Sequence, residues 1–270
     1  MIRKAIIPAA GSGSRFYPLT RAQPKEMLPL VDKPVIHYVV EEAVNSGLDE
    51  ILIIVGAGKE AIINYFDKNK LDDTFMNEDI KHLPDIYFIR QKEQLGLADA
   101  IKYGKKFTDG EDFVVLLGDT VYKSKGKKTV TSELINDYNK HNKKTVIGLE
   151  SVDKNLVNHY GIVSINRDTN AIIRAVEKPD VKAAPSNLAI TGTYIFKDNI
   201  YEYISNLKPG KNNEFQLTDA INMLCSNDSV YGSIINGDRY DIGTMDLWLK
   251  SFLIFLKDDG KFSYVLNTFQ

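Results

Sequence analysis

The sequence has little cysteine, little histidine and almost no excess of charge of either sign. Cys225 is the single cysteine among 270 residues, so an internal disulfide is excluded. The four histidines are scattered, and no Cys/His cluster has the spacing of a zinc site. A formal net charge of −2 and a pI near 6.1 leave no basic field for a polyanion. This argues against nucleic acid as a partner.

Long apolar runs are also missing. No stretch approaches the roughly 18 to 20 residues needed to cross a bilayer, so no membrane partner is expected. The first residues, MIRKAIIPAAGSG, lack the apolar stretch of a signal peptide, which predicts a cytoplasmic setting. With 43% hydrophobic and 26% charged residues, the chain can bury a large core, and such a composition is not typical of disorder.

The first half alternates short β-branched apolar runs with amphipathic stretches. This is the pattern of βαβ units that feed a largely parallel sheet. The fold class predicted is therefore α/β, a doubly wound, Rossmann-like and mostly parallel mixed sheet. Strands are expected at residues 4–8, 51–55, 86–90 and 113–117, and helices at residues 33–46, 59–69 and 98–107.

Past residue 128 strands follow one another with fewer helices between them, which indicates a mixed extension of the same sheet. The basic stretch at residues 123–128 (KSKGKK) is interpreted as a solvated loop. No Gly/Ser/Pro linker divides the chain. Strands are expected at residues 145–151, 161–166, 172–177, 188–196 and 230–235, and helices at about residues 131–142, 199–206, 217–226 and 245–256.

Small residues directly follow the first strand. The segment AAGSGSRFYPLT (residues 9–20) is expected at the carboxyl edge of the sheet, where open α/β folds bind ligands. Gly11 and Gly13 would let backbone N–H groups approach a phosphate. A dinucleotide fingerprint needs a glycine where Phe16 stands, and the Gly-Lys-Ser/Thr of a Walker loop is missing. By itself the segment is equally typical of a structural turn.

Two cations follow in the same region. Arg15 lies within the loop, and Lys25 lies in PKEMLP (residues 24–29), whose prolines cannot continue a helix. Two cations at this position would balance part of the charge of a triphosphate. Taken singly, each is also typical of a solvated surface charge.

A series of segments then occurs in a recognisable order. Together they resemble the motifs of the sugar-nucleotide pyrophosphorylases, over residues 3 to about 255. The resemblance is strongest to the UTP–glucose-1-phosphate uridylyltransferases of bacterial and archaeal type, which are similar to the glucose-1-phosphate thymidylyltransferases. The segments are GSGSRFYPLT, PKEMLPLVDKPVIHYVV, RQKEQLGLADA, LLGDT, HYGIV, VEKP, SNLAITGTYIF, NEFQLTDAI and YDIGT.

The resemblance implies a domain organisation. It predicts the fold of the nucleotide-diphospho-sugar transferases as one domain over residues 1–256, with a nucleotide-binding half at about 1–128 and a sugar-binding half at about 129–244. Residues 257–270 form a C-terminal tail. Two positions depart from the uridylyltransferase pattern. Ser14 replaces the usual threonine but keeps the hydroxyl. The segment LLGDT is more similar to the motif of the thymidylyltransferases than to that of the uridylyltransferases.

The resemblance also implies which residues hold the nucleotide. Gln91 would read the edge of uracil or thymine, because a side-chain amide donates and accepts at once, as a pyrimidine imide requires. Arg15 would surround the phosphates with the backbone of the glycine loop. Without the resemblance, Gln91 would be interpreted as a surface residue at a strand end. The nucleotide-binding positions implied are Ala9, Ala10, Gly11, Gly13, Ser14, Gln91 and Gly96.

A second set would hold the sugar phosphate. Glu177 would bind hexose hydroxyls and Lys178 the phosphate. Glu214 and Asp219 are not assigned, because helix capping by Thr218 and surface solvation explain their segment as well. The positions implied for the sugar phosphate are Tyr160, Gly161, Glu177, Lys178, Asn187 and Thr191.

A metal ion is implied as well. Asp119 ends the apolar run FVVLLG, so its carboxylate is expected at the carboxyl edge of the sheet, and Asp241 in YDIGT is its expected partner. Two carboxylates with phosphate oxygens and water match the octahedral oxygen preference of Mg²⁺. Each aspartate alone is also typical of a strand end or turn.

The activity implied is transfer of a uridylyl group from UTP to α-D-glucose 1-phosphate, with Mg²⁺, giving UDP-glucose and pyrophosphate. Arg15, Lys25 and Lys178 are the expected catalytic counter-charges. A thymidylyltransferase that uses dTTP and a non-catalytic nucleotide-sugar sensor are the alternatives, and an NAD-linked oxidoreductase is less well supported. We expect a homo-oligomer, in which the apolar tail FSYVLNTF (residues 262–269) could dock on a partner subunit or on its own core.

Overall fold

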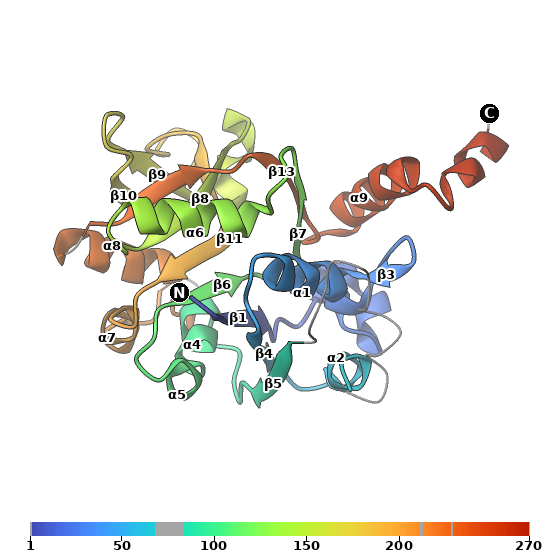
Figure 1. The fold of residues 1–270 in the computed structure, drawn as a ribbon, viewed down its shortest axis with the longest axis horizontal. Helices are drawn as coiled ribbons and strands as arrows, with labels where there is room; N and C mark the ends of the chain where they lie inside the picture. The colour runs from blue at the N-terminus through green and yellow to red at the C-terminus, as the bar shows by residue number, and fades with distance from the viewer. Residues whose placement is uncertain (1, 68–83, 211–212, 228, 270) are drawn as a thin grey trace.

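A central mixed sheet organises the protein (Figure 1). The computed structural model describes residues 2–67, 84–210, 213–227 and 229–269. Neighbouring strands follow the order β10-β9-β11-β6-β1-β4-β5, and β8 joins β11 to β12. The predicted α/β fold is confirmed. The strands of the sheet are β1 (Lys4–Ala9), β4 (Glu50–Val55), β5 (Asp85–Arg90), β6 (Phe113–Leu116), β8 (Val146–Ser151), β9 (Gly161–Ile165), β10 (Ile172–Glu177), β11 (Leu188–Phe196) and β12 (Tyr231–Ile234).

The four strands from the first half are parallel, with β1 between β4 and β6 and β5 outside β4. Side chains of β1 alternate between two cores: Ile7 packs with helix α1 (Val35–Asn45), and Ile6 packs with helix α4 (Leu97–Lys102). Because both faces of β1 are covered, its sequence is continuously apolar instead of alternating. Helix α2 (Glu60–Tyr65) adds Ile62 to the α1 side.

The second half extends the sheet with antiparallel pairs. Strand β11 pairs antiparallel with β6, β8 and β9, whereas β12 is parallel to β8. Helix α6 (Val130–Lys140) covers the same face as α1, and α7 (Ile200–Ser205) and α8 (Leu217–Asn227) cover the face of α4. Both cores therefore contain residues from either side of residue 128.

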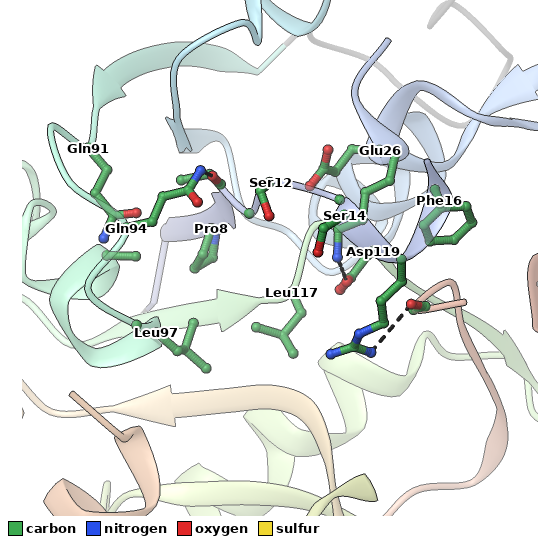
Figure 2. A pocket seen from close by; sticks show the side chains of 18 of the residues that line it. Pro8, Ser12, Ser14, Phe16, Glu26, Gln91, Gln94, Leu97, Leu117 and Asp119 are labelled. Carbon is green, nitrogen blue, oxygen red and sulfur yellow. Dashed lines mark hydrogen bonds and ion pairs between the residues drawn. The ribbon is translucent and has the colours of Figure 1, made fainter. Parts of the chain in front are cut away.

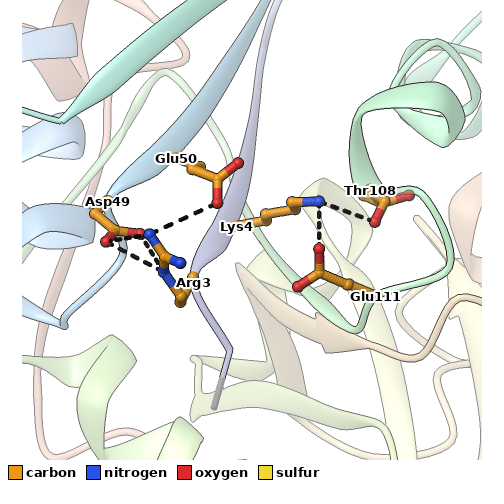
Figure 3. Close-up of polar contacts among 6 residues, drawn as sticks. All are labelled: Arg3, Lys4, Asp49, Glu50, Thr108 and Glu111. Carbon is orange, nitrogen blue, oxygen red and sulfur yellow. Dashed lines mark hydrogen bonds and ion pairs between the residues drawn. The ribbon is translucent and has the colours of Figure 1, made fainter.

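Ion pairs on both sides fix the start of β1 (Figure 3). Arg3 binds Asp49 at 2.8 Å in an exposed pair, which contributes little to stability on its own. Lys4 is buried, contacts Glu111 at 2.5 Å, and donates to the carbonyl of Thr108 at 3.2 Å. These contacts tie β1 to the loops before β4 and β6.

The structure corrects three predictions. The single helix expected at residues 98–107 is two, α4 and α5 (Lys105–Thr108), which meet at Gly104, where a Cβ would collide with Ile6. The basic stretch at residues 123–128 is not entirely loop, since its first two residues end strand β7 (Thr120–Ser124). The helix expected at residues 59–69 ends at Tyr65, and residues 68 and 69 lie outside the described residues.

Two small antiparallel ribbons were not predicted. Strand β2 (Pro29–Leu30) pairs with β3 (Lys33–Pro34), and β7 pairs with β13 (Gly237–Asp241). Helix α9 (Met245–Asp258) follows β13, and the hydroxyl of Thr244 caps it by accepting from the N–H of Leu247 at 3.4 Å. Figure 1 shows α9 and the last helical turns, η6 (Ser263–Phe269), projecting from the body near β7 and β13.

Candidate active site

The loop after β1 forms one wall of a cavity of about 450 Å³ at the carboxyl edge of the parallel strands. Gly13 has a φ of 66°, a left-handed conformation that glycine adopts without strain. Phe16, which stands where a dinucleotide fingerprint needs glycine, is fully buried in an apolar cluster under the loop. The loop is therefore held firmly while Ala10, Gly11, Ser12, Gly13, Ser14 and Arg15 line the cavity.

One end of this cavity presents amides (Figure 2). Gln91, at the end of β5, is 4% exposed, and its Nε2 donates to Asp99 at 2.7 Å. Gln94 donates to the carbonyl of Ala10 at 2.7 Å and so closes the cavity against the glycine loop. Gly96 has a φ of 100°, and a Cβ there would stand 2.8 Å from the carbonyl oxygen of Phe215. Only glycine fits at that contact.

The opposite end carries charge. Lys25 forms an ion pair with Asp119, and Arg15 donates to the carbonyl of Gly243 at 3.4 Å (Figure 2). Burial would lower the pKa of Lys25, but the carboxylates of Asp119 and Glu26 outweigh it and hold that pKa above its usual value. Lys25 is therefore a partly buried, charged ammonium group at the end of the cavity away from the amides.

A second cavity of about 280 Å³ adjoins the first. Arg15, Lys25 and Asp119 line both cavities, so the charged end of the first is a wall of the second. Most of the sequence-predicted sugar positions lie in the second cavity. They are Tyr160, Gly161, Glu177, Lys178 and Thr191.

Contacts within the second cavity orient several of these groups. Lys178 lies 3.3 Å from Glu177, and the hydroxyl of Thr218 donates to Glu177 at 3.4 Å. Thr218 lies inside α8, not at its cap as supposed from sequence. Among the described residues, the Thr191 hydroxyl is fully buried and has no hydrogen-bond partner.

Pairing of β7 with β13 brings the two predicted metal ligands together. Asp241 lies opposite Thr120 in this ribbon, and the N–H of Ile242 donates to the carbonyl of Asp119 at 2.8 Å. Both aspartates line the second cavity.

The two carboxylates have different environments. Burial would raise the pKa of Asp119, but Lys25 outweighs it, so the pKa lies below its usual value. The pKa of Asp241 is raised, first by burial and then by the negative charge of Asp119, with Arg239 the strongest opposing cation. A cation between these carboxylates would relieve the repulsion that raises the pKa of Asp241.

Two predicted residues lie outside the cavities. Ala9 is the buried last residue of β1 and packs in the core under α1. Asn187 lines neither cavity, because its Nδ2 donates to the Ser151 hydroxyl at 2.8 Å and to the Val152 carbonyl at 3.0 Å. The structure therefore places Asn187 as a link between β11 and β8.

Other residues of the site were missed from the sequence. Glu214, set aside there, lines both cavities, and His159 lines the second. Arg239 gives a period-two signal, since it lies two residues before Asp241 on one strand and faces the same way. The residues that the sequence did not assign are Ser12, Glu26, Gln94, His159, Glu214, Gln216, Thr218 and Arg239.

The model of the family described as nucleotidyl transferase matches residues 4–257. The chain belongs to the nucleotidyl transferase family. A UTP–glucose-1-phosphate uridylyltransferase of Mycoplasma genitalium is 43% identical over 268 residues, which cover 93% of this chain and 91% of that relative.

Two solved structures resemble this nucleotidyl transferase along its whole length. One is a UDP-glucose pyrophosphorylase complexed with UDP-glucose, at 35% identity and a TM-score of 0.89, covering 96% of this chain and 100% of that one. The other is the UTP-bound UGPase of Acinetobacter baumannii, at 34% identity and a TM-score of 0.87, covering 100% of this chain and 98% of that one.

A buried ion pair lies in the wall of the first cavity of this nucleotidyl transferase. Glu26 lines the first cavity, is 1% exposed, and binds Lys59 at 2.6 Å. Burial raises the pKa of Glu26, and Lys59 is the strongest of the cations that oppose that rise. Lys59 therefore opposes the loss of charge that burial favours at Glu26 in the wall of the cavity.

Replacing Lys59 with methionine should destabilise the fold by about 3–5 kcal/mol at pH 8, because it leaves the Glu26 charge buried with one counter-charge fewer. The penalty should shrink toward pH 5, since the raised pKa of Glu26 lets it become neutral as the pH falls. Urea unfolding followed by circular dichroism measures both. The double variant Lys59→Met/Glu26→Gln is the control and should recover most of the loss; equal losses for the single and double variants would contradict this account.

Proposed function

We propose that the chain transfers the uridylyl group of UTP to α-D-glucose 1-phosphate and releases pyrophosphate. The observation that carries the proposal is the shared wall of the two cavities, where Arg15, Lys25 and Asp119 face both. A nucleotide in the first cavity and a sugar phosphate in the second would meet at this wall. The relatives, a uridylyltransferase and two UDP-glucose pyrophosphorylases, support the same substrates.

The reaction needs positioning more than proton transfer. An oxygen of the sugar phosphate attacks the α-phosphorus of UTP in line, forming a new P–O bond as the bond to pyrophosphate breaks. A phosphate monoester has a second pKa of about 6, so the nucleophile is already ionised near pH 7 and no general base is required. His159 lines the second cavity, but the proposed mechanism gives it no role as a base.

Charge repulsion is the main obstacle to this reaction. Two like unit charges about 4 Å apart cost roughly 4 kcal/mol at an effective dielectric constant near 20. Arg15 and Lys25 line both cavities and Lys178 lines the second, so these cations are positioned to offset that repulsion.

Nucleotidyltransferases of this kind generally use a divalent metal ion, and we propose Mg²⁺ here. Within the described parts of the chain, no group of three or more His, Cys, Asp or Glu is placed to hold a metal. Asp119 and Asp241 together fit Mg²⁺, which takes one or two protein carboxylates and completes its shell with water and substrate phosphates. Bound there, the ion would neutralise phosphate charge.

The base and sugar assignments rest on fewer contacts. We propose that Gln91 reads the pyrimidine from the amide end of the first cavity and that Glu177 binds hexose hydroxyls. A thymidylyltransferase would place the same groups around dTTP, so the ribose hydroxyl is the point of difference. A silent sensor is less well supported, because Arg15 and Lys25 line both cavities and Lys178 lines the second.

The remaining expectations stay predictions. The homo-oligomer is one of them; α9 and η6 present exposed apolar side chains on the projecting segment in Figure 1, among them Leu249, Leu253, Ile254 and Tyr264. The division at residue 128 and the cytoplasmic setting are others. None of the helices within the described ranges is long and apolar enough to cross a membrane.

The proposal is tested by assaying pyrophosphate release with a panel of UTP, dTTP, ATP and GTP against several sugar 1-phosphates. UTP with glucose 1-phosphate should give the highest kcat/KM. A higher kcat/KM with dTTP would replace uridylyl by thymidylyl transfer. Binding of nucleotide sugars without turnover of any pair would establish the sensor instead.

Replacing Lys25 with alanine should lower turnover by about 10²-fold or more, the scale of losing one preorganised contact that stabilises developing charge. Steady-state pyrophosphate release measures the effect. Lys102→Ala on the exposed side of α4 is the matched control and should be as active as the wild type. Near-full turnover of Lys25→Ala would remove this residue from the mechanism.

Asp119→Asn and Asp241→Asn should each raise the Mg²⁺ concentration for half-maximal activity by about tenfold or more, because the neutral amide is a poorer ligand for a hard cation. Activity is titrated with Mg²⁺ at saturating UTP and glucose 1-phosphate. Asp109→Asn, in the exposed turn after α5, serves as control. Unchanged titrations for both variants would refute the ligand assignment.

A further inference from the structure

Arg239 is a cavity residue to which the mechanism above gives no task. It lies on β13, lines the second cavity, and its side chain is only 7% exposed. Its Nε donates to an oxygen of Glu150 at 2.6 Å, and its NH2 lies 2.5 Å from the same oxygen. Its NH1 lies 3.8 Å from an oxygen of Asp241, and its guanidinium carbon lies 4.4 Å from the centre of the Tyr160 ring.

These contacts occupy the guanidinium from several directions. Glu150 takes one edge of the planar group, Tyr160 covers a face, and NH1 is directed to Asp241. A guanidinium presents its donors in a rigid fork, so the edge that faces Glu150 cannot turn toward a substrate phosphate without leaving that carboxylate. Arg239 thus differs from Lys178, which is half exposed and extends into the same cavity.

We propose that Arg239 is a positioning residue, which holds Asp241 for the metal ion and Tyr160 for the sugar phosphate while Glu150 anchors it. The proposal rests on the function proposed above. In this role, the Arg239 side chain connects the metal ligand Asp241 with the wall of the second cavity.

The anchor explains why the ribbon carrying Asp241 keeps its place. Strand β13 pairs with β7 outside the main sheet, whereas Glu150 lies on β8 within it, opposite Ala189 of β11. The Arg239–Glu150 pair therefore fastens the ribbon to the sheet from the side of the second cavity. A misplaced ribbon would shift Asp241, and Asp119 directly before β7, relative to the second cavity.

The location of Arg239 predicts a selective effect. Arg239 lines the second cavity but not the first, where Gln91 lies. Loss of its fork should therefore weaken metal binding and raise the KM for glucose 1-phosphate together, while the preference for UTP over dTTP stays unchanged. A cation that simply bound phosphate would change turnover without changing metal affinity.

The experiment compares wild type with Arg239→Lys, which keeps the charge but loses the fork. Mn²⁺ binding to the substrate-free protein, followed by electron paramagnetic resonance, should weaken about tenfold, the lower end of the range for losing a partner of a metal ligand. Steady-state kinetics should show a similar rise in the KM for glucose 1-phosphate and an unchanged UTP to dTTP ratio of kcat/KM. Arg174→Lys, exposed on β10, is the matched control and should equal the wild type in every measurement.

A second variant separates positioning from folding. Glu150→Gln keeps a hydrogen-bond acceptor but removes the anchoring charge, so it should reproduce both shifts in weaker form. The double variant should be no worse than Arg239→Lys alone, because residues that act through one another are not additive. If Arg239→Lys does not fold, the Glu150→Gln shifts decide the question in its place.

Unchanged Mn²⁺ affinity and unchanged KM in folded Arg239→Lys and Glu150→Gln would overturn the proposal, and so would a loss of kcat alone. Failure of the proposed function is a different result. If the wild type forms no UDP-glucose, the Mn²⁺ measurement still reports whether Arg239 holds Asp241. If the wild type is active but the Arg239→Lys variant binds Mn²⁺ with unchanged affinity, only the positioning role is refuted.

Discussion

Repulsion between two partly buried carboxylates is the constraint around which the site is built. Antiparallel pairing of β7 with β13 holds Asp241 beside Asp119, and the charge of one raises the pKa of the other. Lys25 and Arg239 offset that repulsion from opposite sides, Lys25 through Asp119 and Arg239 through Asp241. A divalent ion bound between the two carboxylates, as proposed above, would relieve the repulsion that remains.

The same charges define where two polyanions can meet. The first cavity ends in amides at one side and in Arg15, Lys25 and Asp119 at the other, and the second cavity begins at that charged end. A nucleotide lying along the first cavity would have its base at the amides and its phosphates at the charges. A transfer between phosphates then requires no proton acceptor, only neutralisation and alignment.

Buried ion pairs recur around the site, with different consequences. Lys59 opposes the loss of charge that burial favours at Glu26 in the wall of the first cavity, and Glu150 holds Arg239 in the second. Such pairs add little net stability compared with apolar packing, but removing one partner is costly. Such pairs therefore fix the orientation of the side chains that form them. Both pairs connect segments far apart in the chain.

The sequence by itself determined the α/β fold, the strands β1, β4, β5 and β6, and the glycine loop with its neighbouring cations, because these follow from local periodicity and from motifs in one order. It did not reveal β7 and β13. Their polar residues form strands only because the two segments, which lie far apart in the chain, pair with each other. It also did not reveal the hydrogen bonds that the Asn187 amide donates to Ser151 and Val152. Glu150 and Arg239 were paired by tertiary structure alone, since an ion pair between distant residues leaves no periodic signal.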